Sequence, residues 1–364
     1  MDCVHIPSID YGEFSKRIQS KTMNPRMPVN GTFDITSRCN LRCVHCYIQG
    51  INFGDELTYQ EICNILDQIA DEGCLWLLIT GGEPLVRPDF TDIYKYAKGK
   101  GLFITLFTNG TLLTPEIADF LADLPPFAIE ISLYGMSSDT YESITGVPGS
   151  FERCLRGIEL LRERNLYLRL KSMIFPANYH ELKEMKHYAD SMSVPFRFDC
   201  MINAKLDGSM EPAKFRLSPD KIVALDFISE EWVKEWHDFI DRFGNVTAND
   251  YLYNCGAGLN NFHIDSTGHL GVCAISREPR YDLRRGTFHD GFYNAISDVR
   301  AKKRTQHSEC QTCELISICP QCPAWGQLEH GDPEAKVEFL CQVTHLRVAA
   351  LQNHKRPQTE TKHR

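Results

Sequence analysis

Three cysteines near the start of the chain have the type and spacing of metal ligands. Cys39, Cys43 and Cys46 are separated by three and then by two residues. Three thiolates can bind three irons of a cubic [4Fe–4S] cluster, which ordinarily takes four cysteines. The fourth iron would then be open to a ligand that the protein does not supply. A zinc site is the alternative, because zinc takes four ligands and His45 could be the fourth.

A second motif, Gly81-Gly82-Glu83-Pro84, directly follows an apolar run of strand length at residues 75–80. Glycines let a backbone edge approach a ligand closely. The carboxylate of Glu83 can accept a hydrogen bond from an ammonium group. An ordinary loop with a solvated glutamate would match the same four letters. The motif is therefore specific only because it follows a predicted strand and lies downstream of the three cysteines.

Taken together, the cysteine spacing and the GGEP motif resemble those of the radical S-adenosylmethionine (SAM) superfamily. The resemblance implies that SAM chelates the open iron and that one electron from the cluster cleaves it to methionine and a 5′-deoxyadenosyl radical. It assigns Gly81, Gly82 and Glu83 to the amino group of SAM. It also implies that His45 stacks near adenine and that Ser132 contacts polar groups of SAM.

One position departs from this family pattern. Many relatives have an arginine just before the glycine that matches Gly146, and here the residue is Thr145. Lys171, in the fifth predicted strand, could supply the missing cation. A lysine that faces solvent is the alternative.

Seven further cysteines form a pattern in the last third of the chain: Cys255, Cys273, Cys310, Cys313, Cys319, Cys322 and Cys341. The pattern resembles the SPASM extension of radical SAM enzymes, which binds auxiliary [4Fe–4S] clusters. Paired CxxC units are also typical of a zinc ribbon, but seven cysteines exceed one four-cysteine site. We therefore expect one or two auxiliary clusters.

The SPASM resemblance also implies how these cysteines divide. One cluster would take Cys310, Cys313, Cys319 and Cys341. The other would take Cys255, Cys273 and Cys322, and the sequence offers it no fourth cysteine. Its last ligand could be a residue of another type, its fourth iron could be open, or the cluster could be missing. The central run departs from the family in having two residues, not three, between Cys319 and Cys322.

The elements that must position these residues alternate between apolar strands and helices. This alternation predicts an α/β fold with a parallel sheet buried on both faces. Six units predict a partial (β/α)6 barrel, the radical SAM architecture, followed by a small cysteine-rich SPASM domain. The carboxyl ends of such strands meet at one edge, which would bring together the cysteine loop, GGEP and Thr108-Asn109-Gly110. The predicted strands are residues 32–36, 75–80, 102–107, 127–133, 167–174 and 196–201.

Five segments follow from this pattern. Pro25 and Pro28 predict an extended N-terminal arm over residues 1–30, ahead of the barrel at 31–202. The remaining segments are a connecting helical segment at 203–254, the SPASM domain at 255–345 and a polar tail at 346–364.

Composition narrows the class of protein. The chain has 364 residues, 43% of them apolar, and a net charge of −9. An acidic chain argues against a nucleic-acid partner, and no apolar run reaches the roughly 18 residues that span a membrane. We therefore predict a cytoplasmic protein. In a reducing compartment its 15 cysteines are better explained as metal ligands and buried thiols than as disulfides.

We accordingly predict a radical SAM/SPASM oxidoreductase. Many SPASM relatives modify ribosomally made peptides, so a peptide undergoing maturation is the expected substrate. The alternative is a tetrapyrrole or another small molecule in cofactor biosynthesis. Ala274, directly after Cys273, argues against sulfatase maturation, because those relatives have an acidic residue there. A redox-inert cluster scaffold and a zinc-binding interaction module are the other classes.

Partners follow from the same prediction. A reductant such as flavodoxin or ferredoxin would supply electrons. The 30 residues before the first predicted strand leave no room for the peptide-recognition domain that many relatives carry. A precursor peptide would therefore need a separate recognition protein.

Overall fold

One sheet organises the molecule. The computed structural model describes residues 11–22, 26–244, 250–278, 280–305 and 308–354. Within them, nine strands are ordered β6-β5-β4-β3-β2-β1-β7-β8-β9. Their bounds are β1 Asn30–Thr36, β2 Trp76–Gly81, β3 Phe103–Thr108, β4 Ala128–Ser132, β5 Leu168–Met173, β6 Phe196–Asp199, β7 Asn261–Ile264, β8 His269–Gly271 and β9 Tyr281–Asp282.

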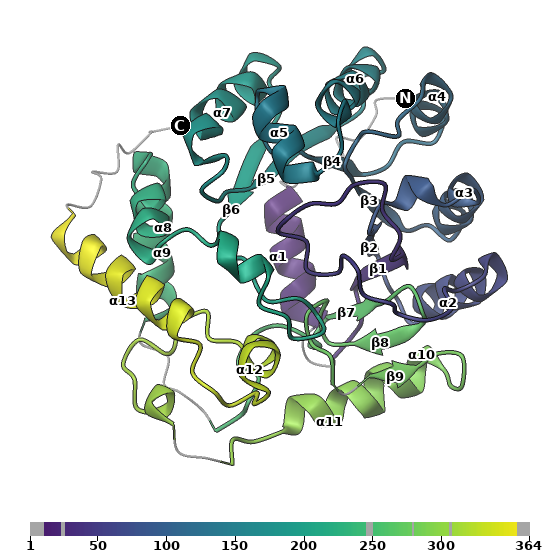
Figure 1. The fold of residues 1–364 in the computed structure, drawn as a ribbon. Coiled ribbons are helices and arrows are strands. Elements are labelled where there is room, and N and C mark those ends of the chain that lie inside the picture. Colours follow the sequence, from purple (N-terminus) through teal and green to yellow (C-terminus); the bar gives the residue numbers. More distant parts are fainter. Residues whose placement is uncertain (1–10, 23–25, 245–249, 279, 306–307, 355–364) are drawn as a thin grey trace, which may run out of the picture.

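Strands β1 to β6 pair in parallel and in sequence order. Figure 1 shows the helices between them forming an arc outside the strands. Strand β6 ends the sheet on one side, so the barrel is open. This confirms the predicted partial (β/α)6 barrel. The helices are α2 Tyr59–Asp71, α3 Phe90–Gly99, α4 Pro115–Asp123, α5 Ser138–Thr145, α6 Ser150–Glu163 and α7 Leu182–Ser191.

The strands differ in what their two faces carry. Apolar residues on the outer face pack under the helices, and Phe33, Leu106 and Leu170 are each 0% exposed. On the inner face, alternate positions of β5 are only half-buried, and Lys171 is one of them. Side chains alternate between the faces of a strand. The outer face therefore supplies the core, and the inner face is left for polar residues.

The C-terminal region continues the sheet instead of forming a separate lobe. Strand β7 pairs in parallel with β1, with Gly31 opposite Phe262. The Phe262 ring fills the space beside Gly31, where a Cβ would lie 2.5 Å from the ring. The sheet therefore crosses the predicted boundary between residues 254 and 255.

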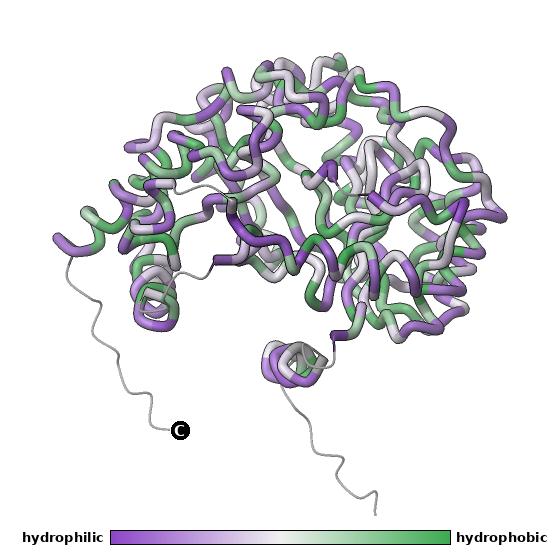
Figure 2. Tube along the Cα trace, turned by 90° about the horizontal axis from the view of Figure 1, so that it is seen from below, coloured by the Kyte–Doolittle hydropathy of each residue, from purple (hydrophilic) through white to green (hydrophobic). Residues whose placement is uncertain are grey.

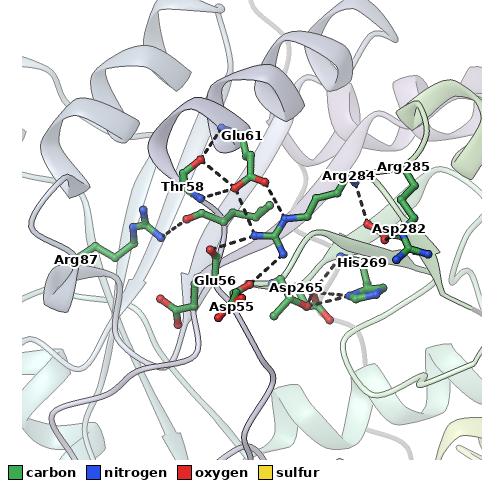
Figure 3. Close-up of polar contacts among 12 residues, drawn as sticks. Asp55, Glu56, Thr58, Glu61, Arg87, Asp265, His269, Asp282, Arg284 and Arg285 are labelled. Carbon is green, nitrogen blue, oxygen red and sulfur yellow. Dashed lines mark hydrogen bonds and ion pairs between the residues drawn. The ribbon is translucent and has the colours of Figure 1, made fainter.

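An arginine fixes the C-terminal region to helix α2, as Figure 3 shows. Thr58 caps α2 in a reciprocal capping box with Glu61. Arg284 donates from Nε to Glu61 Oε1 at 2.8 Å, and its two other nitrogens donate to the carbonyls of Asp55 and Glu56. These bonds join the end of the cysteine loop, the start of α2 and the C-terminal region at one point.

Helices of the later segments differ from the sequence-based expectations. The connecting helical segment predicted at residues 203–254 contains two α-helices, α8 and α9. Residues 346–353 belong to α13 and not to a polar tail, because Arg347 is anchored to Asp226 of α8 at 2.6 Å and Leu351 is buried. The bounds are α8 Pro219–Asp226, α9 Glu230–Phe243, α10 Phe288–Asp290, α11 Ile296–Ala301, α12 Pro323–His330 and α13 Glu338–Asn353.

The expectation of an extended N-terminal arm was wrong for its described part. Tyr11–Thr22 forms helix α1, and Figure 2 shows it outside the main body of the chain. Phe14 of α1 contacts Trp76 at a ring-centroid distance of 6.3 Å. Prolines restrict only their own neighbourhood, so Pro28 does not prevent a helix that ends before it. Pro25 lies outside the described residues.

Within the described part of the chain, none of the helices is both long and apolar enough to cross a membrane.

Candidate functional site

A cavity of about 660 Å³ lies at the carboxyl ends of strands β1 to β6. Loops that follow β1, β2 and β3 form one side, which we call the loop wall. Side chains on the ends of β4, β5 and β6 form the other side, which we call the strand wall. The lining includes Cys39, Cys43, His45, Cys46, Tyr47, Gly81, Gly82, Phe107, Thr108, Asn109, Ser132, Tyr134, Lys171, Arg197 and Asp199. The structure thus brings together nearly all the predicted cluster and SAM residues of the barrel.

The GGEP segment supports the cysteine loop, residues 37–55, through the backbone. Gly82 N–H donates to the carbonyl of Thr36, and Glu83 N–H donates to that of Arg38, each at 2.9 Å. Gly81 has a φ of +133°, and a Cβ there would lie 2.1 Å from the Thr36 oxygen. Glycine is therefore required by contact with the chain's own backbone, in addition to any approach to a ligand.

The end of helix α5 supports the same loop from the other side. Arg42 N–H donates to the carbonyl of Thr145 at 2.8 Å, and Val44 N–H to that of Ile144 at 3.0 Å. Thr145 is itself fully buried. The position where relatives have an arginine thus acts here through its carbonyl, which holds the cysteine loop.

Glu83 lies behind the loop wall and is not part of the cavity lining. It is fully buried and accepts hydrogen bonds from Thr108 Oγ1 at 2.7 Å, Asn109 N at 2.6 Å and Leu85 N at 3.1 Å. Burial raises the pKa of this carboxyl, and the three donors oppose that shift. Glu83 therefore joins the ends of β2 and β3, and Gly81 and Gly82 are the residues of the motif that face the cavity.

A closed set of amide and hydroxyl groups joins the third loop to the first. Asn109 Nδ2 donates to Asn40 Oδ1 at 2.9 Å, Asn40 Nδ2 donates to Thr111 Oγ1 at 2.8 Å, and Thr111 Oγ1 donates to Asn109 Oδ1 at 2.6 Å. Asn109 Nδ2 also lies 3.9 Å from Cys39 Sγ. The TNG segment thus fixes the first cysteine.

His45 presents a neutral ring to the cavity. Burial lowers its pKa to about 4, so the imidazole is uncharged at neutral pH. Its centroid lies 4.8 Å from Tyr134 and 5.0 Å from Phe175. The Nδ1 atom is buried and has no hydrogen-bond partner among the described residues. A flat, neutral ring with an unused polar atom suits contact with a heterocycle such as adenine.

The strand wall carries charge. Lys171 stands opposite Ser132 in the β4–β5 register, and its Nζ lies 2.9 Å from the Phe107 ring centroid. Burial lowers the pKa of Lys171 to about 7. Arg197 donates to Glu130 at 2.6 Å and also lines the cavity. Lys171 therefore faces inward, and the alternative of a solvent-facing lysine was wrong.

The thiols of the cysteine loop fit a metal cluster chemically. Burial raises the pKa of Cys39 to about 11 and also raises those of Cys43 and Cys46. The Cys46 thiol further raises the pKa of both Cys39 and Cys43, and Cys39 raises that of Cys43. Three neighbouring thiolates would repel one another, and cluster iron offsets that cost because it binds the deprotonated form. Backbone N–H groups already point at two sulfurs: Leu41 at Cys39, 3.4 Å away, and Ile48 at Cys46.

The C-terminal thiols fall into the two predicted groups. The thiols of Cys255, Cys273 and Cys322 interact electrostatically with one another. A separate set of mutual interactions joins Cys310, Cys313, Cys319 and Cys341. Such couplings require proximity. These interactions join residues far apart in the sequence, and both the division of the seven cysteines between two clusters and their roles as ligands stay predictions.

Among the described residues, no three His, Cys, Asp or Glu side chains converge on one point as the ligands of a single metal ion would. The ligands of a cubic cluster do not converge on one point, because each thiolate binds its own iron atom.

Comparison with known proteins decides the family. A family model described as the radical SAM superfamily matches residues 33–189. An AdoMet-dependent heme synthase of Methanosarcina barkeri is 38% identical over 326 residues, which cover 82% of this chain and 92% of that protein. The chain belongs to the radical SAM superfamily. It is an enzyme, and SAM and a [4Fe–4S] cluster are the cofactors of its family.

Other members of the superfamily resemble the chain over most of its length. Mycofactocin maturase MftC of Mycobacterium tuberculosis is 31% identical, with 85% of this chain and 79% of that protein covered. The crystal structure of Streptococcus suis SuiB bound to precursor peptide SuiA superposes with a TM-score of 0.70, 17% identity and coverage of 93% and 85%. The SuiB likeness shows a shared fold. SPASM-type maturases and heme synthases are thus both relatives of this radical SAM enzyme.

Sequence reasoning missed some residues of the site. Asn40 supports the cysteine loop without lining the cavity, and its place beside Cys39 could have indicated it. Two lining residues, Arg197 and Asp199, were also missed. Arg197 and Asp199 gave no such signal, because nothing in the sequence says which face of β6 is the inner one.

Proposed function

We propose that this radical SAM enzyme removes hydrogen from a substrate whose carboxylate is bound at the strand wall. The observation that carries the proposal is the inward position of Lys171 beside Arg197 on the cavity lining. A cation that is partly withdrawn from water attracts an anion more strongly than an exposed one. A carboxylate held there would face the cysteine loop across the cavity.

The chain's own residues divide the work. Cys39, Cys43 and Cys46 would hold the [4Fe–4S] cluster, which supplies the electron that cleaves SAM. The backbone at Gly81 and Gly82 would accept the amino group of SAM, His45 would stack on its adenine, and Ser132 would hydrogen-bond to its polar groups. Lys171 and Arg197 would orient the substrate.

A tetrapyrrole with carboxylate side chains is the first candidate substrate. It is supported by the 38% identity with a heme synthase along 92% of that relative. Lys171 and Arg197 offer such a molecule two neighbouring cations. The cavity is lined by aromatic as well as charged groups, including Phe107 and Tyr134, which suits a flat ring system with an anionic edge.

A ribosomally made peptide is the second candidate, as the sequence predicted. The similarity to mycofactocin maturase over 85% of this chain supports it, as does the grouping of the seven C-terminal cysteines. A peptide carboxylate, at the chain end or on a side chain, would use the same two cations. In that case a precursor peptide and a separate recognition protein would be the partners, and flavodoxin or ferredoxin would be the reductant in either case.

The experiment offers both substrates to the same preparation. Anaerobic protein with SAM and reductant is incubated with iron coproporphyrin III or with the peptide encoded beside the gene, with and without any small neighbouring protein. A mass decrease in the tetrapyrrole that requires Cys39 supports the first candidate. The same change in the peptide alone transfers the proposal to the second. Unaltered masses in every arm, with SAM still cleaved, contradict a substrate of either class.

Cluster number is tested separately in a variant with Cys39, Cys43 and Cys46 all replaced by alanine. We propose that its SPASM region still binds iron and sulfide, about four irons for one auxiliary cluster and about eight for two, because such a cluster contains four irons. An iron-free variant that contains zinc would contradict the SPASM assignment.

A further inference from the structure

Glu130 is a buried carboxylate two residues before Ser132, and unlike Ser132 it does not line the cavity. It lies in the middle of β4 and is 5% exposed. A buried charge needs partners that replace water. Arg169 and Arg197 of the neighbouring strands supply them, and only Arg197 lines the cavity. The difference between the two arginines indicates what the carboxylate does.

Strand register sets how far each arginine must reach. Arg169 of β5 stands directly opposite Glu130, and its Nη1 lies 3.5 Å from Glu130 Oε1. Arg197 of β6 is opposite Lys171, and Lys171 is in turn opposite Ser132. Because β5 lies between β4 and β6, the Arg197 side chain must cross β5 to reach Glu130.

The hydrogen bonds show which edge of the Arg197 guanidinium is occupied. Nε donates to Glu130 Oε2 at 3.1 Å, and Nη2 donates to the same oxygen at 2.6 Å. A guanidinium carries five N–H donors in a fixed planar arrangement. Among the described residues, Nη1 and the second N–H of Nη2 have no hydrogen-bond partner. The edge that these donors form is therefore available to a ligand.

Burial indicates where the free edge lies. The side chain of Arg197 keeps 57% of its surface exposed, whereas that of Glu130 keeps only 6%. The Phe107 ring, which also lines the cavity, lies 5.7 Å from Arg197 Cζ and contacts Lys171 Nζ. The guanidinium is thus fixed by a buried carboxylate and lies near an aromatic ring, and its free donors are left to the cavity.

This arrangement suits a planar anion. Two parallel N–H groups on one edge of a guanidinium match the two oxygens of a carboxylate. The ammonium group of Lys171, opposite Arg197 in the β5–β6 register, attracts the same anion as a point charge. A guanidinium that is already fixed loses less freedom when a ligand binds. A carboxylate that fixes it would therefore favour binding, although its own charge repels the ligand.

We propose that Glu130 is a positioning residue, which holds Arg197 with its free edge toward the carboxylate of the substrate. Glu130 touches no substrate atom and acts only through Arg197. The proposal rests on the proposed function, in which Lys171 and Arg197 bind that carboxylate. It applies to a tetrapyrrole and to a peptide alike, because both would present the same anionic group.

Charge and position predict opposite effects when Glu130 is removed. Without its negative charge, the cations of the strand wall should attract an anion more strongly, and KM should fall. Without its hold on Arg197, that side chain must be ordered each time the substrate binds, and KM should rise by about 2- to 10-fold. The direction of the change in KM therefore separates a positioning role from a charge-balancing one.

The test measures kcat and KM of the anaerobic, full-length enzyme for iron coproporphyrin III and, in a second series, for the peptide encoded beside the gene. Glu130→Gln keeps the shape of the side chain with a weaker acceptor, and Glu130→Met removes the acceptor. KM should rise in both variants, and more in Glu130→Met. Formation of 5′-deoxyadenosine without substrate verifies that each variant binds its cluster and SAM.

Arg169→Gln is the matched control. It removes the other partner of Glu130 and leaves the bonds between Glu130 and Arg197 in place. Because Arg169 does not line the cavity, its KM should change less than that of either Glu130 variant. A KM that rises as much in Arg169→Gln would contradict a role that passes through Arg197.

A second background shows whether Glu130 acts through Arg197. In Arg197→Met protein, KM should already be raised, and adding Glu130→Gln should raise it no further, since the two side chains form one unit. A general disturbance of the fold would raise KM again in this background, and that result would contradict the proposal.

The remaining outcomes separate this proposal from the proposed function. If Arg197→Met raises KM but both Glu130 variants lower it or leave it unchanged, the positioning role is disproved and the carboxylate site stands. If neither compound is turned over, or if Arg197→Met leaves KM unchanged in both series, the carboxylate site itself is wrong. The positioning role then fails together with the proposed function.

Discussion

The two walls of the cavity are built by different means. The loop wall is held by backbone hydrogen bonds and by groups buried behind it, such as Glu83 and the carbonyl of Thr145. The strand wall is made of side chains that project directly from β4, β5 and β6, among them Lys171 and Arg197. A substitution in the loop wall therefore acts by changing the geometry of a loop. In the strand wall, a side chain can be replaced while the backbone of the strand stays in place.

This difference suggests which wall serves which molecule. A cofactor common to a family needs a fixed backbone frame, which the loop wall provides. Substrate differs between heme synthases and peptide maturases, and a strand wall allows such changes without disturbing the frame. We therefore expect substitutions on the loop wall to affect SAM chemistry with any substrate. Substitutions of Lys171 and Arg197, on β5 and β6 of the strand wall, should affect the substrate alone.

The largest expected effect is on the loop wall. Cys43→Ala removes one of three thiolates, and a cluster left with two has too few ligands to be held. Cleavage of SAM to 5′-deoxyadenosine by the reduced, anaerobic protein should fall to background. Cys200→Ala is the control, because that buried thiol belongs to the core and not to the cavity lining. Cleavage that persists in the Cys43 variant would disprove the site.

On the strand wall, Lys171→Met should weaken turnover of the true substrate and spare uncoupled SAM cleavage. Loss of a hydrogen bond to a charged group costs about 1.5–3 kcal/mol, which corresponds to about a 10- to 160-fold decrease in kcat/KM. Steady-state kinetics with substrate, and 5′-deoxyadenosine formation without it, measure the two effects. If both fall together, the two walls are not separate in function.

The protonation of Lys171 gives the same wall a pH dependence. Burial disfavours the ammonium form and lowers its pKa to about 7, so the side chain is charged below that pH and neutral above it. Affinity for a carboxylate substrate should decrease as the pH rises through about 7, by at most the loss expected for Lys171→Met. Lys171→Arg stays charged and should flatten the KM profile. A profile that is the same in both proteins would remove Lys171 from substrate binding.

Glu83→Gln tests the support behind the loop wall. The amide keeps the shape of the side chain but has one acceptor oxygen for the hydroxyl of Thr108 and the N–H groups of Leu85 and Asn109. Leaving a buried donor unsatisfied costs about 1–3 kcal/mol. Denaturant unfolding should show a loss of this size, accompanied by weaker SAM binding. Glu61→Gln, at the more exposed cap of α2, should cost less, and the reverse order would contradict this view of Glu83.

The smallest effect is expected at Ser132, where the walls meet. Ser132→Ala removes one neutral hydroxyl, and such a hydrogen bond contributes about 0.5–1.5 kcal/mol. SAM affinity measured by calorimetry should fall by about 2- to 10-fold, while substrate affinity stays within error. If Ser132→Ala weakened only substrate binding, Ser132 would belong to the substrate site, and the assignment of SAM and substrate to the two walls would have to change.

The sequence by itself determined the parts whose chemistry is local. Three cysteines within eight residues can meet whatever the rest of the chain does, so Cys39, Cys43 and Cys46 were readable as a cluster site. The alternation of apolar strands and helices similarly predicted the partial barrel, because a strand buried on both faces is apolar along nearly its whole length. The capping box of Thr58 and Glu61 is local in the same way, since both partners lie within one turn.

Tertiary structure alone decided which side chains face which way. Strand composition does not reveal the inner face, so only the fold showed Lys171 entering the cavity and Glu83 turning away from it. Tyr253 and Ser276 are 23 residues apart, and only the packing of the C-terminal region brings them into contact. The sequence also did not show that the sheet continues across residue 255. Pairing of distant strands depends on packing between residues such as Gly31 and Phe262, and no local sequence pattern predicts such packing.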